Sequence, residues 1–324
     1  MTMREIGGYF GLEEFSNKEY HSDLIALNLA RNALLYLLKA RNINKLYIPY
    51  YLCDSIKGVC EKYGYAFDYY NINTSFLPEF SAALGETEYL YIVNYFGQID
   101  DDMILKFKER YSNIIIDNAH AFFQKPVAGI DTIYSCRKFF GVPYGAYLST
   151  TLKMDLKLDI DVSKDRMTHQ LGRYETLASN YYPHFLRHEE SLNDEPLKYM
   201  SKLTHNILRA IDYDRVKRVR NDNYAYLDKM LGSLNKLKLT IPDGAFAYPL
   251  LIDNGMSIKK TLAEKKIYIP TLWPNVLIDT PEESIEQEYA KNILSLPCDQ
   301  RYGINEMKYM LNTMKSAGVI KAYT

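Results

Sequence analysis

Two neighbouring stretches decide the fold class of this chain: residues 113–123 read NIIIDNAHAFF, and residues 131–145 read DTIYSCRKFFGVPYG. In each stretch a short apolar run leads directly into reactive side chains. The first run ends at Asp117, with His120 soon after, and the second ends at Ser135, with Lys138 three positions later. Strands that are apolar on both faces are typical of a parallel sheet covered by helices on both sides. Because ligands bind at the carboxyl ends of such strands, we expect these side chains to gather at one edge of the sheet.

The surrounding sequence, from about residue 23 to residue 150, alternates between strand and helix patterns. We predict strands at 45–49, 65–72, 89–94, 113–117, 131–135 and 145–149, and helices at 31–41, 54–63 and 101–111. In the second of these helices Asp54 is a good N-cap, and Gly64 ends the helix. This alternation predicts an α/β fold with a mostly parallel sheet.

After residue 150 the pattern changes. Residues 151–200 are polar and irregular, and a long amphipathic helix is predicted at 205–231. Short strands and helices then alternate at 245–252, 257–265, 267–270, 293–297 and 304–318. We therefore predict a large domain at 20–205 and a smaller α+β domain formed by 1–19 and 206–324.

The composition excludes several classes of function. The chain has 324 residues, is 47% hydrophobic and carries 39 basic against 40 acidic residues, so no net field attracts nucleic acid or an anionic membrane. The four cysteines lack disulfide or metal spacing, and no signal peptide or membrane span is evident. A cytoplasmic protein without disulfides is the expectation.

The reactive side chains are those that pyridoxal 5'-phosphate (PLP) requires. PLP needs a lysine amine for a Schiff base and an acid that keeps its pyridine nitrogen protonated. Hydroxyls, backbone amides and an arginine hold its phosphate, usually at a helix N-terminus. Lys138 offers the amine, Asp117 offers the acid, and Ser135 offers a hydroxyl for the phosphate. Arg31 and Asn32 open the first predicted helix. Taken singly, each residue also has a plain structural explanation as a helix cap or a surface charge, and the spacing leaves both open.

Segments along almost the whole chain resemble the fold-type-I PLP enzymes, specifically the nucleotide-sugar aminotransferases of the DegT/StrS group, whose fold is that of aspartate aminotransferase. IIDNAHAFF (115–123) resembles their Asp-x-Ala-His/Gln motif, and YSCRKFFGVPYGAYL (134–148) resembles their lysine loop. Four further segments resemble the family in the same order: ALNLARNALLYLLKARNINKLYIPYYLCDSI (26–56), NYFGQIDD (94–101), LKYMSKLTHNILRAIDYDRVKRVRNDNYAYL (197–227), which resembles the long helix that joins the domains, and ILSLPCDQRYGINEMKYML (293–311).

The resemblance implies a role for each matching residue. Lys138 would carry PLP and move protons, Asp117 would pair with the pyridine nitrogen, and His120 would lie beside the ring. A ring-stacking aromatic is expected just after Pro49; strict alignment puts Cys53 there, and we choose Tyr51 instead. The residues implied to hold the phosphate are Ser135, Ala30, Arg31 and Asn32.

Three stretches depart from the family. Ala30 and Arg31 stand where its members have Gly-Thr or Ala-Thr, and PYGA (143–146) replaces Gly-Glu-Gly-Gly. LKY (197–199) replaces an Asn-Tyr-Arg that reaches the phosphate of the neighbouring subunit. These departures leave the cofactor expectation intact and weaken the expected substrate and partner-subunit contacts.

The implied function is an aminotransferase that aminates a keto sugar linked to a nucleotide, uses an amino-acid donor such as glutamate, and forms a homodimer. An amino-acid aminotransferase, a sugar dehydratase and a catalytically silent binding protein remain alternatives; Lys138 argues against the dehydratases that replace this lysine with histidine. His184 and His188 have the spacing of a helical zinc pair, but no third ligand is evident, so no metal site is expected.

Overall fold

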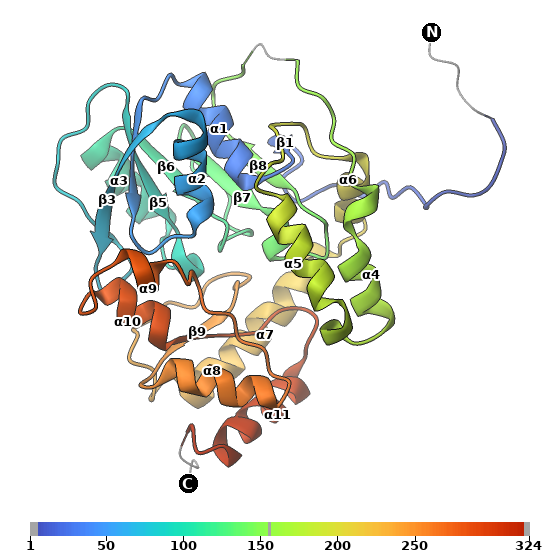
Figure 1. Cartoon of the computed structure of the whole chain (residues 1–324), viewed down its shortest axis with the longest axis vertical. Helices are drawn as coiled ribbons and strands as arrows, with labels where there is room; N and C mark the ends of the chain where they lie inside the picture. Colours follow the sequence, from blue (N-terminus) through green and yellow to red (C-terminus); the bar gives the residue numbers. More distant parts are fainter. Residues whose placement is uncertain (1–5, 155–156, 321–324) are drawn as a thin grey trace.

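The computed structural model describes residues 6–154 and 157–320, and in these residues eight strands form one sheet with the order β1–β8–β7–β6–β5–β2–β3–β4 (Figure 1). The five central strands run parallel: β2 (Lys45–Pro49), β3 (Ala66–Ile72), β5 (Glu88–Val93), β6 (Ile114–Asp117) and β7 (Asp131–Ser135). The other three strands pair antiparallel with their neighbours: β8 (Ala146–Ser149) with β7, β1 (Ile25–Leu27) with β8, and β4 (Pro78–Glu79) with β3. The predicted α/β class with a mostly parallel sheet is confirmed.

The helices cover both faces of this sheet. Helix α2 (Asp54–Tyr63) connects β2 to β3, and α3 (Asp101–Tyr111) connects β5 to β6 in the opposite direction across the sheet. Because such crossovers are right-handed, the two helices lie on opposite faces. Helix α1 (Ala30–Ala40) packs beside α2, and both lie in front of the sheet in Figure 1. The strand order reverses between β5 and β2, which places a crevice beyond the carboxyl ends of these strands.

The C-terminal region forms a second layer below the sheet in Figure 1. Its two-stranded sheet pairs β9 (Tyr248–Leu251) with β10 (Ile293–Leu296). Apolar side chains of the small sheet and its helices form a core of their own, with Leu227, Leu250 and Leu294 fully buried. The helices of this region are α7 (Tyr213–Leu231), α8 (Gly255–Glu264), α9 (Val276–Asp279), α10 (Ile285–Asn292) and α11 (Ile304–Ser316).

Three predictions about the second half were wrong. The long helix at 205–231 is two helices, α6 (Lys202–Arg209) and α7, because the Asp212 side chain accepts the Arg215 N–H at 2.9 Å and caps a new helix. The region 151–200 is not irregular throughout, since it contains α4 (Thr168–Glu175) and α5 (Tyr182–Ser191). Residues 267–270 form no strand. The domain boundaries stay a prediction, and residues 1–5 and 321–324 of the predicted small domain lie outside the described residues.

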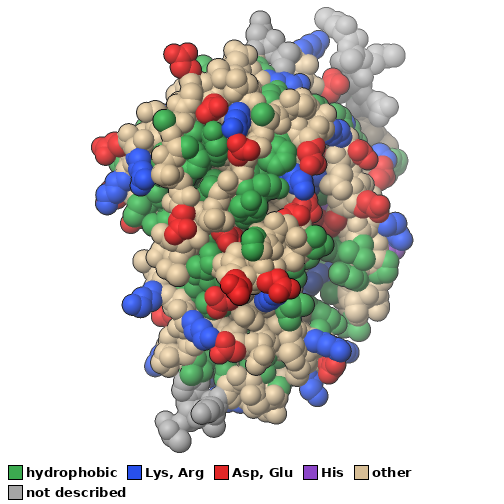
Figure 2. Space-filling view, turned by 60° about the vertical axis from the view of Figure 1, so that its left-hand side comes forward, with side chains coloured by type: hydrophobic (Ala, Val, Ile, Leu, Met, Phe, Trp, Pro, Cys, Tyr) green, Lys and Arg blue, Asp and Glu red, His purple; other side chains and the backbone are tan. Residues whose placement is uncertain are grey.

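The structure also bears on the expectations about disulfides, membrane spans and surface charge. All four cysteines are free thiols. Within the described ranges, every helix is too short or too polar to cross a bilayer. Basic and acidic side chains are interspersed over the face in Figure 2, which fits the near-zero net charge.

Candidate functional site

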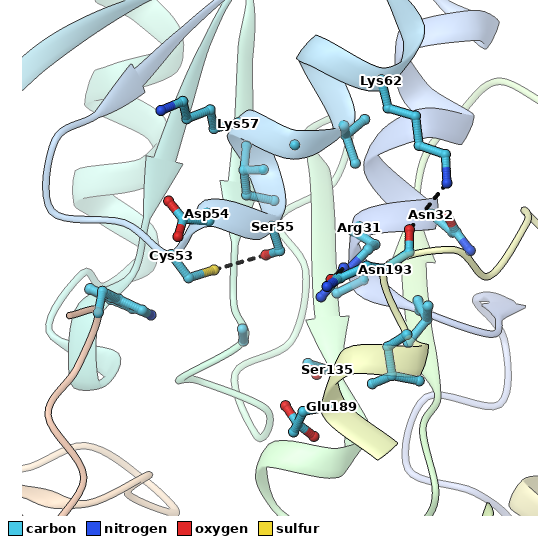
Figure 3. Close-up of a pocket in the computed structure, with 18 of the residues that line it drawn as sticks. Arg31, Asn32, Cys53, Asp54, Ser55, Lys57, Lys62, Ser135, Glu189 and Asn193 are labelled. Atoms are coloured by element: carbon cyan, nitrogen blue, oxygen red, sulfur yellow. Dashed lines mark hydrogen bonds between the residues drawn. The ribbon is translucent and has the colours of Figure 1, made fainter. Parts of the chain in front are cut away.

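A cavity of about 920 Å³ opens at the carboxyl end of the parallel strands. Its wall combines the first turns of α1 and α2, the end of β6, the turn after β7, α5 and a loop of the C-terminal region (Figure 3). The strand order brings these segments together, because its reversal leaves a gap there between neighbouring connections. The reactive lining residues include Arg31, Cys53, Ser55, Asp117, Ser135, Arg137, Lys138 and Glu189.

Lys138 ends the short 3-10 turn Cys136–Lys138 that follows β7. Its side chain is reached from the cavity that it lines and does not pack into the core. The surrounding protein lowers the pKa of the amine by desolvation, and the Arg137 guanidinium lowers it further. The carboxylates of Glu189 and Asp117 act in the opposite direction. A lowered pKa raises the fraction of neutral amine, which is the nucleophilic form.

Asp117 ends β6 and reaches the same cavity. One carboxylate oxygen accepts a hydrogen bond from the Tyr91 hydroxyl at 2.8 Å, and the other accepts the Ala119 N–H at 2.8 Å. Burial raises the pKa of this carboxyl, while these two hydrogen bonds and the charge of Lys138 oppose the rise. A cationic group placed against this buried carboxylate would therefore be stabilised.

The N-terminus of α1 forms one end of the cavity, the candidate anion-binding end. Its N-cap residue Leu29 has an extended backbone and provides no capping side chain, so the N–H groups of Arg31 and Asn32 have no partner within the helix. Backbone N–H groups and the helix dipole at such a terminus favour an anion. Helix α2 also begins without a side-chain cap, but Asp54 in its first turn carries a negative charge. The first turn of α1 contains no acidic residue and is the better anion site.

Two arginines supply positive charge near this terminus. The guanidinium of Arg31 donates to the Asn193 side chain at 2.5 Å, and that of Arg137 forms an ion pair with Glu189. Ser135 also lines this part of the cavity. In contrast, the buried side chain of Asn32 donates hydrogen bonds to the carbonyls of residues 195 and 196, and so stabilises the loop behind the helix. Of the four residues predicted to hold a phosphate, Ala30 has no polar side chain and the Asn32 side chain is bonded elsewhere, so these two could contribute only backbone groups.

His120 lies behind the cavity wall. Its ring stacks on Phe246 at a centroid distance of 4.0 Å and lies nearly parallel to Trp273 at 5.7 Å. Burial lowers the pKa of His120 well below its ordinary value, so the ring is neutral, and its Nδ1 has no hydrogen-bond partner among the described residues. Trp273 itself lines the cavity. The C-terminal region therefore contributes an aromatic side chain to the cavity, in addition to Tyr63 and Tyr91 of the first half.

Tyr51, the predicted stacking residue, does not reach the cavity. Its side chain is fully buried against Tyr95 and Trp273. Cys53, which strict alignment placed at this position, does line the cavity, and its sulfur lies 2.8 Å from the Ser55 hydroxyl. The structure thus brings Cys53 rather than Tyr51 to the site.

A second cavity, of about 760 Å³, lies on the other side of the Lys138 turn and shares Arg137, Lys138 and Glu189 with the first. It lies between the turn, α4, α5 and the C-terminal region. Arg173 and Arg301 bring positive charge to its wall. Lys138 therefore has access to two adjoining spaces, one that ends at the α1 N-terminus and one that faces the C-terminal region.

The predicted histidine pair forms a different arrangement. His188 bonds to the carbonyl of Pro143 at 2.8 Å, while His184 contacts Arg187. No group of three metal-ligating side chains occurs in the part of the chain that the structure describes.

The sequence matches no protein-family model and no curated protein. Solved structures are nevertheless similar. A DegT DnrJ EryC1 StrS aminotransferase from Brucella abortus matches with a TM-score of 0.63 at 14% identity, over 91% of this chain and 85% of that chain. The PLP form of the putative sugar aminotransferase Spr1654 from Streptococcus pneumoniae matches with a TM-score of 0.64 at 14% identity, over 92% and 88% of the two chains. This chain has the sugar aminotransferase fold.

The fold is not confined to aminotransferases. The GDP-4-keto-6-deoxy-D-mannose-3-dehydratase of E. coli, with bound hydrated PLP, matches with a TM-score of 0.60 at 14% identity, over 90% of this chain and 87% of that chain. The resemblance found in the sequence is confirmed at the level of fold, and the fold is that of PLP-dependent enzymes.

Sequence reasoning missed Tyr91, Trp273 and Glu189. Tyr91 lies inside an apolar strand pattern, and Glu189 lies in a region predicted to be irregular. Trp273 carries the one usable signal, because it is the only tryptophan in the chain and stands in a loop between Pro270 and Pro274.

Proposed function

We propose that this chain is a PLP-dependent aminotransferase that converts the keto group of a nucleotide-linked sugar into an amine, with glutamate as the expected amine donor. One observation carries the proposal: Lys138 and Asp117 line a single cavity that ends at the open N-terminus of α1 beside Arg31. The amine, the buried acid and the anion site are the three groups that PLP requires.

The residues present fit this cofactor. Asp117 is a buried carboxylate that accepts two hydrogen bonds but has no ion-pair partner among the described residues, and a protonated ring nitrogen would supply the missing positive charge. The N–H groups of the first turn of α1, together with Arg31 and Ser135, would hold the phosphate. When bound, PLP supplies a ring that takes up the negative charge that develops on the substrate carbon.

Each residue then has a defined task. Asp117 keeps the proton on the ring nitrogen, and the Tyr91 hydroxyl orients its carboxylate. The Nζ of Lys138 removes the proton from the donor Cα and transfers a proton to the cofactor. The lowered pKa of this amine suits it to the task, because it raises the fraction of the neutral form that can accept a proton. Trp273, backed by the ring of His120, excludes water from one side of the cavity.

The second cavity is the proposed substrate side. It adjoins Lys138. Among the described residues, Arg173 on its wall donates a hydrogen bond to the Tyr302 hydroxyl at 3.2 Å and pairs with no carboxylate, whereas Arg301 is held by both oxygens of Asp299. The charge of Arg173 is therefore available to an anionic substrate. We also propose that the chain forms a homodimer. A measurement of the molar mass in solution tests this proposal.

The test is a titration of the purified protein with PLP, followed by visible absorption. A band that forms with the wild type and with the control Lys106→Ala, but not with Lys138→Ala, is the expected result; Lys106 is an exposed lysine on α3. Glutamate should then bleach the band as the amino group is transferred. If excess PLP gives no band with the wild type, the proposed function is wrong.

A further inference from the structure

The anion-binding end of the cavity contains a carboxylate. Glu189, on α5, forms an ion pair with Arg137, and its side chain is about one-third exposed, at 34%. Figure 3 shows it near Ser135, in the part of the cavity where Arg31 lies. Within this group Arg31 and Arg137 carry two positive charges, and Glu189 carries one negative charge.

The segment that follows Glu189 holds the second arginine. Asn193 accepts a hydrogen bond from Arg31 at 2.5 Å through its side chain, and its carbonyl accepts one from Lys62 of α2 at 3.2 Å (Figure 3). Residues 189–193 therefore engage both arginines at once and fasten α5 to the first two helices. Arg31 also experiences the charges of Arg137 and Glu189, which places the three groups in one electrostatic neighbourhood.

We propose that Glu189 is an internal counter-ion of the phosphate site, which competes with an incoming phosphate for Arg137 and so weakens cofactor binding until the ion pair opens. The inference rests on the proposed function only in taking a phosphate as the anion. Two guanidinium groups and the α1 N-terminus match a doubly charged phosphate, and the Glu189 carboxylate both uses one guanidinium and repels the phosphate.

The alternative is that Glu189 positions Arg137 for the phosphate. The two roles predict opposite changes in the affinity for phosphate when the charge of Glu189 is removed. A competitor, when its charge is removed, leaves Arg137 free and binding tightens; a positioning residue, when removed, lets Arg137 move and binding weakens. The neutral variant Glu189→Gln keeps the size of the side chain and removes only its charge.

The experiment measures the Kd of inorganic phosphate by calorimetry and the Kd of PLP by visible absorption, for the wild type, Glu189→Gln and Glu190→Gln. Glu190 is the neighbouring, exposed acid on α5 and lines neither cavity, so its variant changes the net charge equally. We expect Glu189→Gln to lower both Kd values about tenfold, since the interaction with one partly solvated charge is removed, and Glu190→Gln to leave them within twofold.

Weaker or unchanged phosphate binding in Glu189→Gln overturns the inference, as does equal tightening in the Glu190→Gln control. Absence of phosphate binding in all three proteins also overturns it, because no anion site would then exist. Tighter phosphate binding in Glu189→Gln without any PLP band supports the inference while the proposed function fails. Unfolding curves of the variants confirm that each protein is folded.

Discussion

Replacing Asp117 with Asn should separate the cofactor role of this residue from a structural one. The carboxylate is buried, and burial raises its pKa, so its ionised form costs the cofactor-free protein stability at neutral pH. Asn removes that cost. It also alters the hydrogen bond from Tyr91, whose loss is worth about 1 kcal/mol. These effects oppose each other, so we expect the free energy of unfolding without PLP to change by no more than about 1 kcal/mol.

With PLP present, the same substitution should greatly slow the half-reaction with glutamate. The neutral amide cannot hold a positive charge on the ring nitrogen, and the interaction of two unit charges at contact is worth about 4 kcal/mol at an effective dielectric constant of about 20. That energy corresponds to a loss of about a thousandfold in the rate of the glutamate half-reaction. Stopped-flow absorption after mixing with glutamate measures this rate, and urea unfolding measures the stability.

Two results would refute this reasoning about Asp117. A half-reaction rate within about tenfold of the wild type would show that Asp117 does not hold the charge on the ring. A loss of more than about 3 kcal/mol in the cofactor-free protein would show that its main role is structural. Asp102→Asn, at an exposed position in the first turn of α3, is the control for the substitution itself.

Three further predictions concern other parts of the molecule. Arg31→Gln should weaken PLP binding about 10- to 100-fold, as expected for a lost hydrogen bond to a charged group, whereas the exposed Arg218→Gln should not change it in an absorption titration. Arg220→Met should lower the free energy of unfolding in urea by about 3 kcal/mol or more, because fully buried Arg220 donates to carbonyls of the Lys138 turn and of the C-terminal region, which would lose their partner. Burial raises the pKa of Glu19, but its hydrogen bond with His205 and other contacts lower it more, to below the ordinary 4.5. The stability that Glu19 contributes is thus present above pH 4.5 and lost as the pH falls through the folded pKa, so thermal midpoints of the wild type and Glu19→Gln should converge in acid.

The sequence by itself determined six of the eight strands of the sheet, all but the short edge strands β1 and β4, and the edge at which reactive groups gather. The predicted bounds of β2, β7, α2 and α3 agree with the structure, because these segments have strong local patterns. The prediction of Asp54 as the N-cap of α2 was wrong: Cys53 occupies that position without a side-chain hydrogen bond, and Asp54 is the first helical residue. Asp117 and Lys138 were expected near each other, since both follow strands whose carboxyl ends meet at one edge, and the structure places both on one cavity.

Only the tertiary structure decided which distant side chains complete the cavity. Trp273 and Glu189 come from segments far from Lys138 in sequence, and the packing of α5 and of the C-terminal region brings them to the site. Tyr51 and Cys53 lie in an irregular turn after β2, where no period sets the direction of a side chain, so the sequence could not tell which one faces the cavity. Local patterns arise from contacts a few residues apart, whereas the wall of a site depends on long-range packing that these patterns do not encode.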